Sequence, residues 1–334
     1  MMRTAIYGAG SLGTIMGAYL TKAGVDIELI NRNKKHIEAL KKNGATITGT
    51  VHMNVPVKAL LPEEMHGKYD IIFLMTKQLG NKNTAEMLKN YLADDGILCT
   101  LQNGLPEPEL AEILGESRVM GCTVAWGATL GAPGVSELTS EPDSLTFGLG
   151  KMPGVSQEKL QEVKGVLEKM CPVEVEENFK GVRFSKLLIN AAFSGMSAVL
   201  GSTFGEAAQD KKSRVCVQKL IKECIDVAAA AGIRIAPVQG KDIVKLLDYG
   251  NPIKKKIAFM IIPMAIKKHA RLRASMLQDL EKGKPCEVDA INGVVCSFGR
   301  KYHVPTPYND KVVEILHRME KGELKPGFGN LALF

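Results

Sequence analysis

Short apolar runs alternate with helical repeats over the first hundred residues. Strands are predicted where apolar residues follow one another, and helices where they recur every three or four positions. The predicted strands lie at residues 3–8, 25–31, 69–76 and 97–104, and the predicted helices between them lie at residues 11–24, 33–44 and 81–96. A run that is apolar throughout, such as "IIFLM", is typical of a strand in a parallel sheet, buried on both faces. The alternation predicts a doubly wound α/β domain.

The pattern changes from about residue 117. Antiparallel strands with Gly and Pro turns are predicted at residues 118–140 and 144–150, then a helix at 156–170 and a short strand at 171–178. After residue 180 the strand signals fade, and helices are predicted at residues 184–201, 212–232, 240–250 and 287–303. A chain of 334 residues is long for a single core. We therefore expect an α/β domain over residues 1–179 and an all-α domain over residues 180–334.

Composition and charge narrow the classes of partner. The chain is 45% hydrophobic and 24% charged, an ordinary profile for a soluble protein, with a net charge of +7. Basic residues are scattered and aromatic residues make up only 5%, so an anionic small molecule is favoured over a nucleic acid. The apolar run at residues 257–266 is too short to span a bilayer and contains Pro263. It either belongs to the core or forms a contact in a homodimer.

The seven cysteines show no pattern of a disulfide framework or a zinc site. No Cys-x-x-Cys pair occurs, and no His lies at metal-ligand spacing from a Cys. Buried free thiols in a reducing compartment explain them. A strand begins at residue 3 without a preceding signal segment. We therefore expect a cytoplasmic protein that holds no metal.

The first candidate site is the glycine loop "GAGSLG". Gly8, Gly10 and Gly13 follow a predicted strand and open a predicted helix in the pattern G-x-G-x-x-G. Glycine permits the tight turn and lets backbone N–H groups approach a pyrophosphate, which the helix N-terminus also attracts. The alternative is a purely structural turn. The alternating strands that follow favour dinucleotide binding.

The end of the second strand favours NADP(H). An NAD site usually carries an acidic residue there, but Glu28 lies mid-strand and is expected to face solvent. The strand ends at Asn31 and Arg32, followed by Lys34 and Lys35, and these cations suit a 2′-phosphate. In the alternative interpretation they are the solvated start of a basic helix.

The second candidate site is the helix "KLLINAAFS". Lys186, Asn190 and Ser194 recur every fourth residue and share one helix face. Apolar residues surround Lys186, and burial lowers a lysine pKa enough to make a proton donor near neutral pH. Alternatively, its ammonium reaches solvent from the helix edge. Spacing alone does not separate these two possibilities.

The third candidate is the polar stretch at residues 274–293. A Gly-Pro interruption separates two helical segments, and Ser275, Asp279, Glu287 and Asp289 are the side chains that a ligand cleft would use. Taken alone, the stretch is better described as a solvated turn.

Together these stretches resemble the ketopantoate reductase family, the 2-dehydropantoate 2-reductases. The resemblance covers nearly the whole chain, through "GAGSLG", "KQ", "LQNGL", "APGV", "KLLIN" and "SMLQDLEKGKPCEVDAINGVV". It implies a Rossmann-type domain and a helical domain with the active site in the cleft between them. It also implies NADPH-dependent reduction of a 2-oxo acid to a 2-hydroxy acid in pantothenate biosynthesis.

The resemblance also implies roles at matching positions. The pyrophosphate would lie on Gly8, Ala9, Gly10, Ser11, Leu12 and Gly13. Arg32 and Lys77 would meet the adenosine phosphate, and Gly127 would contact the cofactor through its backbone. Asn103 would lie beside nicotinamide and substrate. Lys186 would be the general acid, Glu287 would position it and touch the cofactor, and Asn190 and Ser275 would bind the substrate.

Two positions depart from the family pattern. Many members have an Asn at the position of Ser194, and some have an Asn at that of Phe204. A hydroxyl can replace one hydrogen bond to the substrate, but a phenyl ring cannot. Two alternatives to ketopantoate reduction follow: a D-2-hydroxy acid dehydrogenase for another branched or aromatic 2-oxo acid, and a non-catalytic NADP(H) sensor. The complete set Lys186, Asn190, Ser275 and Glu287 disfavours the sensor.

Overall fold

The structure is a computed structural model, and it describes residues 2–238 and 240–334. The chain divides into two compact units. Unit 1 comprises Met1–Gln102 and Pro106–Phe179, and unit 2 comprises Asn103–Leu105 and Lys180–Phe334. Each unit has its own hydrophobic core.

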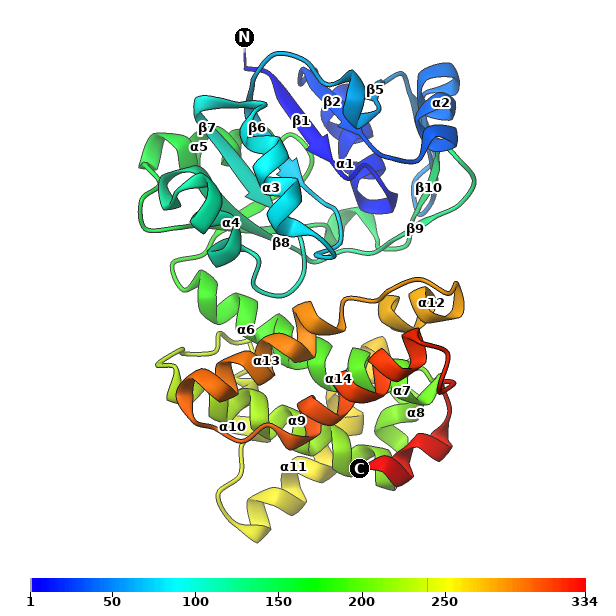
Figure 1. The fold of residues 1–334 in the computed structure, drawn as a ribbon, viewed down its shortest axis with the longest axis vertical. Coiled ribbons are helices and arrows are strands. Elements are labelled where there is room, and N and C mark those ends of the chain that lie inside the picture. The colour runs from blue at the N-terminus through cyan, green and yellow to red at the C-terminus, as the bar shows by residue number, and fades with distance from the viewer. Residues whose placement is uncertain (1, 239) are drawn as a thin grey trace. The chain divides into compact units, whose positions relative to one another are not determined.

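The main sheet of unit 1 has eight strands in the order β12-β11-β8-β7-β6-β1-β2-β5 (Figure 1). Their bounds are β1 (Thr4–Tyr7), β2 (Ile27–Ile30), β5 (Lys58–Leu60), β6 (Tyr69–Leu74), β7 (Leu92–Thr100), β8 (Val119–Val124), β11 (Phe147–Lys151) and β12 (Val173–Val175). The six strands from β8 to β5 are parallel, and β11 joins β8 in antiparallel orientation. The carboxyl ends of the six parallel strands therefore lie at one edge.

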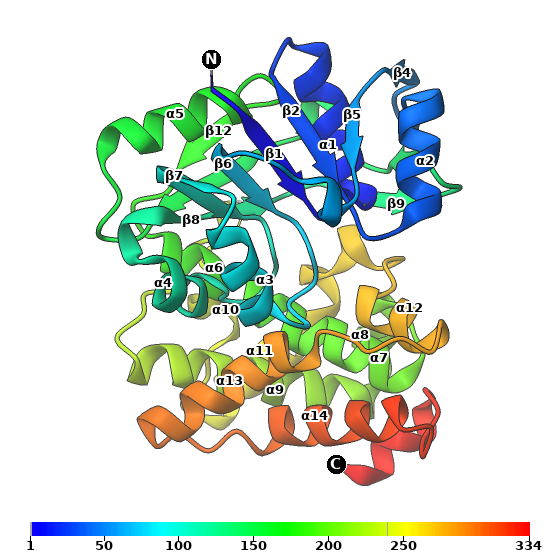
Figure 2. The same ribbon diagram turned by 45° about the horizontal axis from the view of Figure 1, so that its top comes forward.

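Helices cover both faces of this sheet. They are α1 (Ser11–Lys22), α2 (Lys34–Asn43), α3 (Asn81–Lys89), α4 (Glu107–Leu114) and α5 (Gln157–Leu167). Successive strand residues point to opposite faces, so Ile6 and Leu29 enter a core with residues of α1, α2 and α5. Tyr7 and Ile30 enter a second core with residues of α3 and α4, which lie side by side (Figure 2). The predicted doubly wound α/β domain is confirmed.

A second, four-stranded sheet was not predicted. It has the order β4-β3-β10-β9, formed by β3 (Ala45–Gly49), β4 (Met53–Val55), β9 (Ala128–Leu130) and β10 (Val135–Leu138). The predicted antiparallel pairing within residues 118–140 is confirmed for β9 and β10. However, β8 also pairs in parallel with β7, and β10 pairs in parallel with β3.

The helix predicted over residues 81–96 is wrong after Lys89. Strand β7 begins at Leu92, which is buried and is the register partner of Tyr69 in β6. The register between β6 and β7 then shifts, so that Ile71 pairs with Ile97 and residues 93–96 form an irregularity in the strand. Burial of Leu92 outweighs the helical pattern of the preceding residues.

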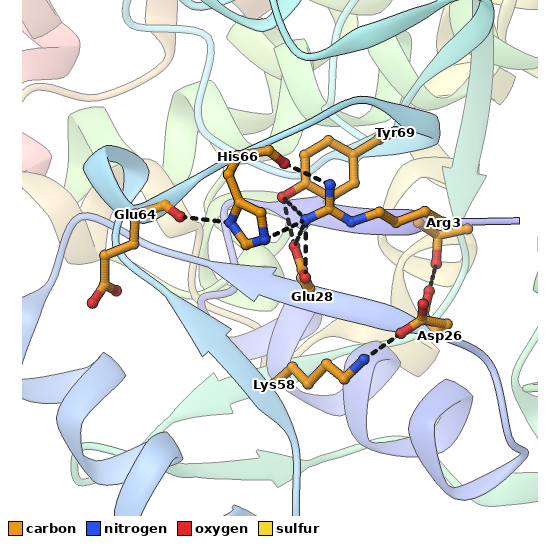
Figure 3. A network of polar contacts seen from close by, with 8 residues as sticks. Arg3, Asp26, Glu28, Lys58, Glu64, His66 and Tyr69 are labelled. Carbon is orange, nitrogen blue, oxygen red and sulfur yellow. Dashed lines mark hydrogen bonds and ion pairs between the residues drawn. The ribbon is translucent and has the colours of Figure 1, made fainter.

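The prediction that Glu28 faces solvent is also wrong. Its side chain is buried and accepts hydrogen bonds from the Arg3 guanidinium at 2.9 and 3.1 Å and from the Tyr69 hydroxyl (Figure 3). Burial of a carboxylate requires such a charged partner. Glu28 is the second residue of β2, so it lies away from the carboxyl edge of the sheet. It is therefore a structural ion-pair residue.

Unit 2 is helical, as predicted. Its elements are α6 (Phe179–Ile189), a π-helical segment, η4 (Asn190–Ser194), α7 (Gly195–Leu200), α8 (Phe204–Gln209), α9 (Lys211–Ala230), α10 (Ile243–Leu247), α11 (Pro252–Ala265), α12 (Ser275–Glu281), α13 (Val288–Tyr302) and α14 (Pro307–Glu320). Helix α9 packs against α8, α11, α13 and α14 (Figure 1). Its buried face supplies the centre of the core.

Only part of the apolar run at residues 257–266 belongs to the core. Ala258 and Ile262 are buried in the core of unit 2, whereas Ile257, Met260 and Met264 on the same helix are 46%, 53% and 66% exposed. One face of α11 is therefore core, and the other is an apolar surface.

Candidate functional site

The glycine loop connects β1 to α1. Gly8 has a φ of +105°, and a Cβ there would lie 2.6 Å from the backbone nitrogen of Thr76. The backbone N–H groups of Gly8 and Ala9 both donate to the carbonyl of Ile30, at 2.9 Å each. The loop is therefore fixed to the carboxyl end of β2, and only glycine fits at its first position.

The other two glycines serve different purposes. A Cβ on Gly13 would lie 2.9 Å from the carbonyl oxygen of Gly8 and 3.0 Å from Cγ2 of Ile6, so this glycine allows α1 to pack closely on β1. A Cβ on Gly10 would meet no atom closer than 3.9 Å. Gly10 therefore leaves open space at the N-terminus of α1, next to Ser11 and Leu12. First-turn N–H groups have no partner within a helix, so this end of α1 can receive an anionic group.

The buried side chain of His36 is linked to the glycine loop through the hydroxyl of Thr14. The Gly134 N–H donates to Nδ1 of His36 at 3.1 Å, so in the neutral ring the proton lies on Nε2, 3.1 Å from Thr14 Oγ1. The Thr14 hydroxyl then donates to the carbonyl of Ala9 in the loop. Burial lowers the pKa of His36 below its ordinary value of 6.5, which favours this neutral form.

The state of His36 predicts how stability depends on pH. Because its folded-state pKa is lowered, the unfolded chain binds the proton more readily, and stability falls as pH drops below 6.5. His36→Gln retains an acceptor and a donor but does not titrate. We expect the Tm of the wild type to fall more than that of the variant between pH 7.5 and pH 5.5, as measured by circular dichroism. Parallel curves would contradict a neutral His36.

The other predicted cofactor residues follow carboxyl ends of the same sheet. Arg32 follows β2, Lys77 follows β6, and both are exposed. Gly127 follows β8; its N–H donates to Ser140 Oγ at 2.9 Å, and its carbonyl accepts from the Thr139 N–H at 3.1 Å. The backbone of Gly127 is thus already bonded within unit 1, whereas Arg32 and Lys77 extend from the edge where the glycine loop lies.

A separate cavity of about 100 Å³ lies within unit 2. Its lining combines six polar side chains with two apolar ones, namely Asn103, Lys186, Asn190, Ser194, Ser275, Glu287, Met276 and Ile291. The structure thus brings together the residues to which the resemblance assigns substrate-binding or catalytic roles, whereas the cleft candidates Asp279 and Asp289 do not line this cavity. Met276 and Ile291 were missed, because in the sequence an apolar residue beside a polar site cannot be distinguished from core.

Four different elements position these side chains. Lys186 lies in the last turn of α6, Asn190 and Ser194 lie in the π-helical segment η4, and Ser275 is the first residue of α12. Glu287 is buried at the N-cap of α13. The chain around Asn103 belongs to unit 2 although it follows β7 of unit 1.

The π-helical segment changes how Ser194 faces the cavity. In an α-helix of 3.6 residues per turn, Ser194 would be rotated about 80° from Lys186 around the axis. A π turn contains more residues and therefore reduces this rotation. The predicted shared face is thus achieved with a local departure from α-helical geometry, which the sequence spacing did not reveal.

Phe204 belongs to the core of unit 2. It is buried and packs on Phe193, with ring centroids 5.9 Å apart. Its backbone N–H donates to the carbonyl of Leu272 at 2.9 Å. Phe204 therefore brings no side-chain hydrogen bond to a substrate, so Ser194 is the departure that directly lines the cavity.

Three observations concern cysteine thiols, metal ions and membrane helices. All seven cysteines are buried free thiols, as predicted. Within residues 2–238 and 240–334, no three His, Cys, Asp or Glu side chains are grouped to hold a metal ion. In the described part of the chain, no helix is both long enough and apolar enough to cross a membrane.

Comparisons with known proteins agree with this arrangement. Residues 4–151 match the family described as "Ketopantoate reductase PanE/ApbA", and residues 178–320 match "Ketopantoate reductase PanE/ApbA C terminal". A 2-dehydropantoate 2-reductase from Pyrococcus horikoshii is 28% identical over 313 residues, which are 92% of this chain and 94% of the relative.

Two solved structures show the same fold. A PanE/ApbA family ketopantoate reductase from Ralstonia eutropha JMP134 has a TM-score of 0.82 at 22% identity, and a D-mandelate dehydrogenase solved with NADH and anilino(oxo)acetate has 0.83 at 22%. Each match covers 96% of this chain and 99% of the other. Since the two family matches together span most of the sequence, the chain belongs to the ketopantoate reductase family of oxidoreductases.

Proposed function

We propose that the protein reduces 2-dehydropantoate (ketopantoate) to (R)-pantoate with NADPH, as a step in pantothenate and coenzyme A biosynthesis. The observation that carries the proposal is the cavity in which Lys186 shares a lining with two amides, two hydroxyls and the Glu287 carboxylate. The glycine cradle in unit 1, and relatives named 2-dehydropantoate 2-reductase, support it.

The cavity residues divide the work of 2-oxo acid reduction. A bound nicotinamide supplies the hydride, and negative charge then develops on the carbonyl oxygen of the substrate. Lys186 stabilises this charge and donates a proton to the oxygen. Asn103, Asn190, Ser194 and Ser275 orient the substrate through hydrogen bonds, and Glu287 positions Lys186. Met276 and Ile291 form the apolar part that receives the alkyl group.

NADPH is the proposed cofactor because Arg32 and Lys77 extend from the carboxyl edge of the sheet. The acidic residue of strand β2 is Glu28. Its carboxylate is bonded to Arg3 and lies away from that edge. The D-mandelate dehydrogenase among the structural relatives was solved with NADH.

Arg32→Ala is expected to weaken NADPH specifically. Loss of a hydrogen bond to a charged phosphate costs about 1.5–3 kcal/mol, so the Kd for NADPH should rise about 10- to 100-fold while that for NADH stays nearly constant. Fluorescence titration measures both constants. Lys41→Ala is the matched control, since Lys41 is an exposed cation of α2 that pairs with Glu64. Equal losses for the two cofactors would show that Arg32 does not bind the 2′-phosphate.

A second candidate function is reduction of a different branched or aromatic 2-oxo acid by the same chemistry. Ser194 and Phe204 motivate it, because neither provides the amide found in many members of the family. Steady-state kcat/KM values for ketopantoate and for branched, linear and aromatic 2-oxo acids decide between the two. A wide margin for ketopantoate supports the proposed substrate, and a wide margin for another acid supports the alternative.

We also propose that the protein forms a homodimer. A dimeric ketopantoate reductase from Staphylococcus aureus shares the fold, with a TM-score of 0.74 and 18% identity. The exposed side chains of α11, among them Ile257, Met260 and Met264, are the candidate contact. Analytical ultracentrifugation of the full chain measures the state.

A further inference from the structure

A chain of buried polar groups begins at Glu223 on α9. Its carboxylate accepts hydrogen bonds from the backbone N–H groups of Tyr308 and Asn309, both at 2.9 Å, and from Asn309 Nδ2 at 2.8 Å. The first two donors lie in the first turn of α14, where N–H groups lack helical partners. Glu223 therefore fixes α14 and also orients the Asn309 amide.

The orientation of Asn309 determines that of Asn292 on α13. Because Asn309 Nδ2 faces the carboxylate, its Oδ1 faces Asn292 and must receive a donor. Asn292 Nδ2 donates to that oxygen at 2.9 Å, and its second proton goes to the carbonyl of Ala191 at 3.0 Å. The hydrogen bonds thus lead from α9 through α14 and α13 to the π-helical segment that lines the cavity.

The π turn leaves the carbonyl of Ala191 without an N–H donor from its own helix. The Gly195 N–H donates to the carbonyls of Asn190 and Ala192, five and three residues earlier, and not to that of Ala191. In a regular α-helix the Gly195 N–H would bond to Ala191, four residues earlier, so the π turn passes this carbonyl over. An unpaired buried carbonyl costs about 1–3 kcal/mol. Asn292 supplies the missing donor, which favours the π turn over a regular α-helix.

Stability alone does not explain an asparagine at position 292. The side chain is fully buried, and its Oδ1 has no hydrogen-bond partner among the described residues. A buried amide with an unsatisfied oxygen is less stable than a fully bonded one. An apolar residue of similar size could not form the two hydrogen bonds that Asn292 donates to Ala191 and Asn309.

We propose that Asn292 is a positioning residue for substrate binding: by bonding to Ala191 it maintains the π turn that directs Asn190 and Ser194 into the cavity. Asn309 and Glu223 hold Asn292 in the orientation that this bond requires. The inference deepens the proposed function and rests on it for its kinetic readout. It concerns geometry within unit 2, whereas the glycine loop lies in unit 1.

The test compares Asn292→Leu with Asn330→Leu. Asn330 Nδ2 donates to the carbonyl of Val199 at 2.9 Å, so the control removes a similar bond from α7 away from the cavity. For the best 2-oxo acid substrate, kcat/KM of the Asn292 variant should fall about 10- to 100-fold, chiefly through KM, because small displacements of binding groups have effects of this size. The Kd for NADPH should stay constant, and the control should keep its KM even where its Tm falls.

Three results would overturn the proposal: unchanged kinetics in Asn292→Leu, an equal rise in KM in the control, or a retained π turn in the crystal structure of the Asn292 variant. If Asn292→Leu does not fold, Asn292→Ala replaces it in the same test, because that substitution only removes atoms. If the wild type reduces no 2-oxo acid, the proposed function fails, and the crystal structure still decides whether Asn292 maintains the π turn.

Discussion

Lys186→Ala is expected to reduce kcat/KM by about 10²- to 10⁴-fold, the range typical of losing a general acid. The cavity lining loses its ammonium group. In the proposed mechanism this group both stabilises charge on the carbonyl oxygen and donates the proton. The Kd for NADPH should change little, because the glycine loop belongs to unit 1 and Lys186 to unit 2. Stopped-flow and titration experiments measure the two quantities separately.

Lys180→Ala is the matched control for this variant. Lys180 lies on the same helix but is exposed, so its removal deletes one charge without affecting the cavity. Its kinetics should equal those of the wild type. A small primary amine added to Lys186→Ala should restore part of the rate. Near-normal turnover without added amine would mean that another group donates the proton.

Gly10→Ala is expected to weaken NADPH and NADH alike, by about 10- to 100-fold in Kd. A methyl group at this position enters the open space in front of α1, and forcing a ligand against such a group costs about 1–3 kcal/mol. The variant should keep its fold, because the nearest atom beyond its chain neighbours, the carbonyl oxygen of Gly8, lies 3.9 Å from the new Cβ. Titration with both dinucleotides measures the loss of binding, and a thermal melt measures whether the fold is kept.

Gly13→Ala provides the contrast. Its Cβ would lie 2.9 Å from the carbonyl oxygen of Gly8, so this variant should lose more Tm than Gly10→Ala. The two glycines of one motif would thus be separated into a ligand-approach role and a packing role. If Gly10→Ala bound both dinucleotides as tightly as the wild type, the pyrophosphate would not lie on this loop.

Much of the fold could be predicted from local patterns. The parallel strands are continuous apolar runs, and α1 and α9 carry clear helical repeats, so burial and periodicity agree there. The second sheet could not be predicted, because β4 has only three residues and β3 pairs with β10, about ninety positions away. Glu28 was misplaced because its partners are distant in sequence: Arg3 precedes β1, and Tyr69 is the first residue of β6.

The candidate site was predictable at the level of residue types. Lys186 and Asn190 stand out as polar groups in a partly apolar helix, whereas Ser275 and Glu287 were identified through the family resemblance. All four line one cavity. The π turn was not predictable, since it depends on a donor from Asn292, roughly one hundred residues away. Sequence spacing gives the identity of groups on a helix face, whereas distant hydrogen bonds decide the final direction of each side chain.

The most informative single measurement is hydride transfer from NADPH deuterated at C4 of the nicotinamide, in each of its two stereoisomers, to ketopantoate. The product is then analysed by mass spectrometry and NMR. We predict (R)-pantoate carrying one deuterium at C2 from one of the two stereoisomers and none from the other. Absence of NADPH oxidation with ketopantoate, or pantoate without deuterium at C2 from either stereoisomer, would contradict direct reduction of this 2-oxo acid.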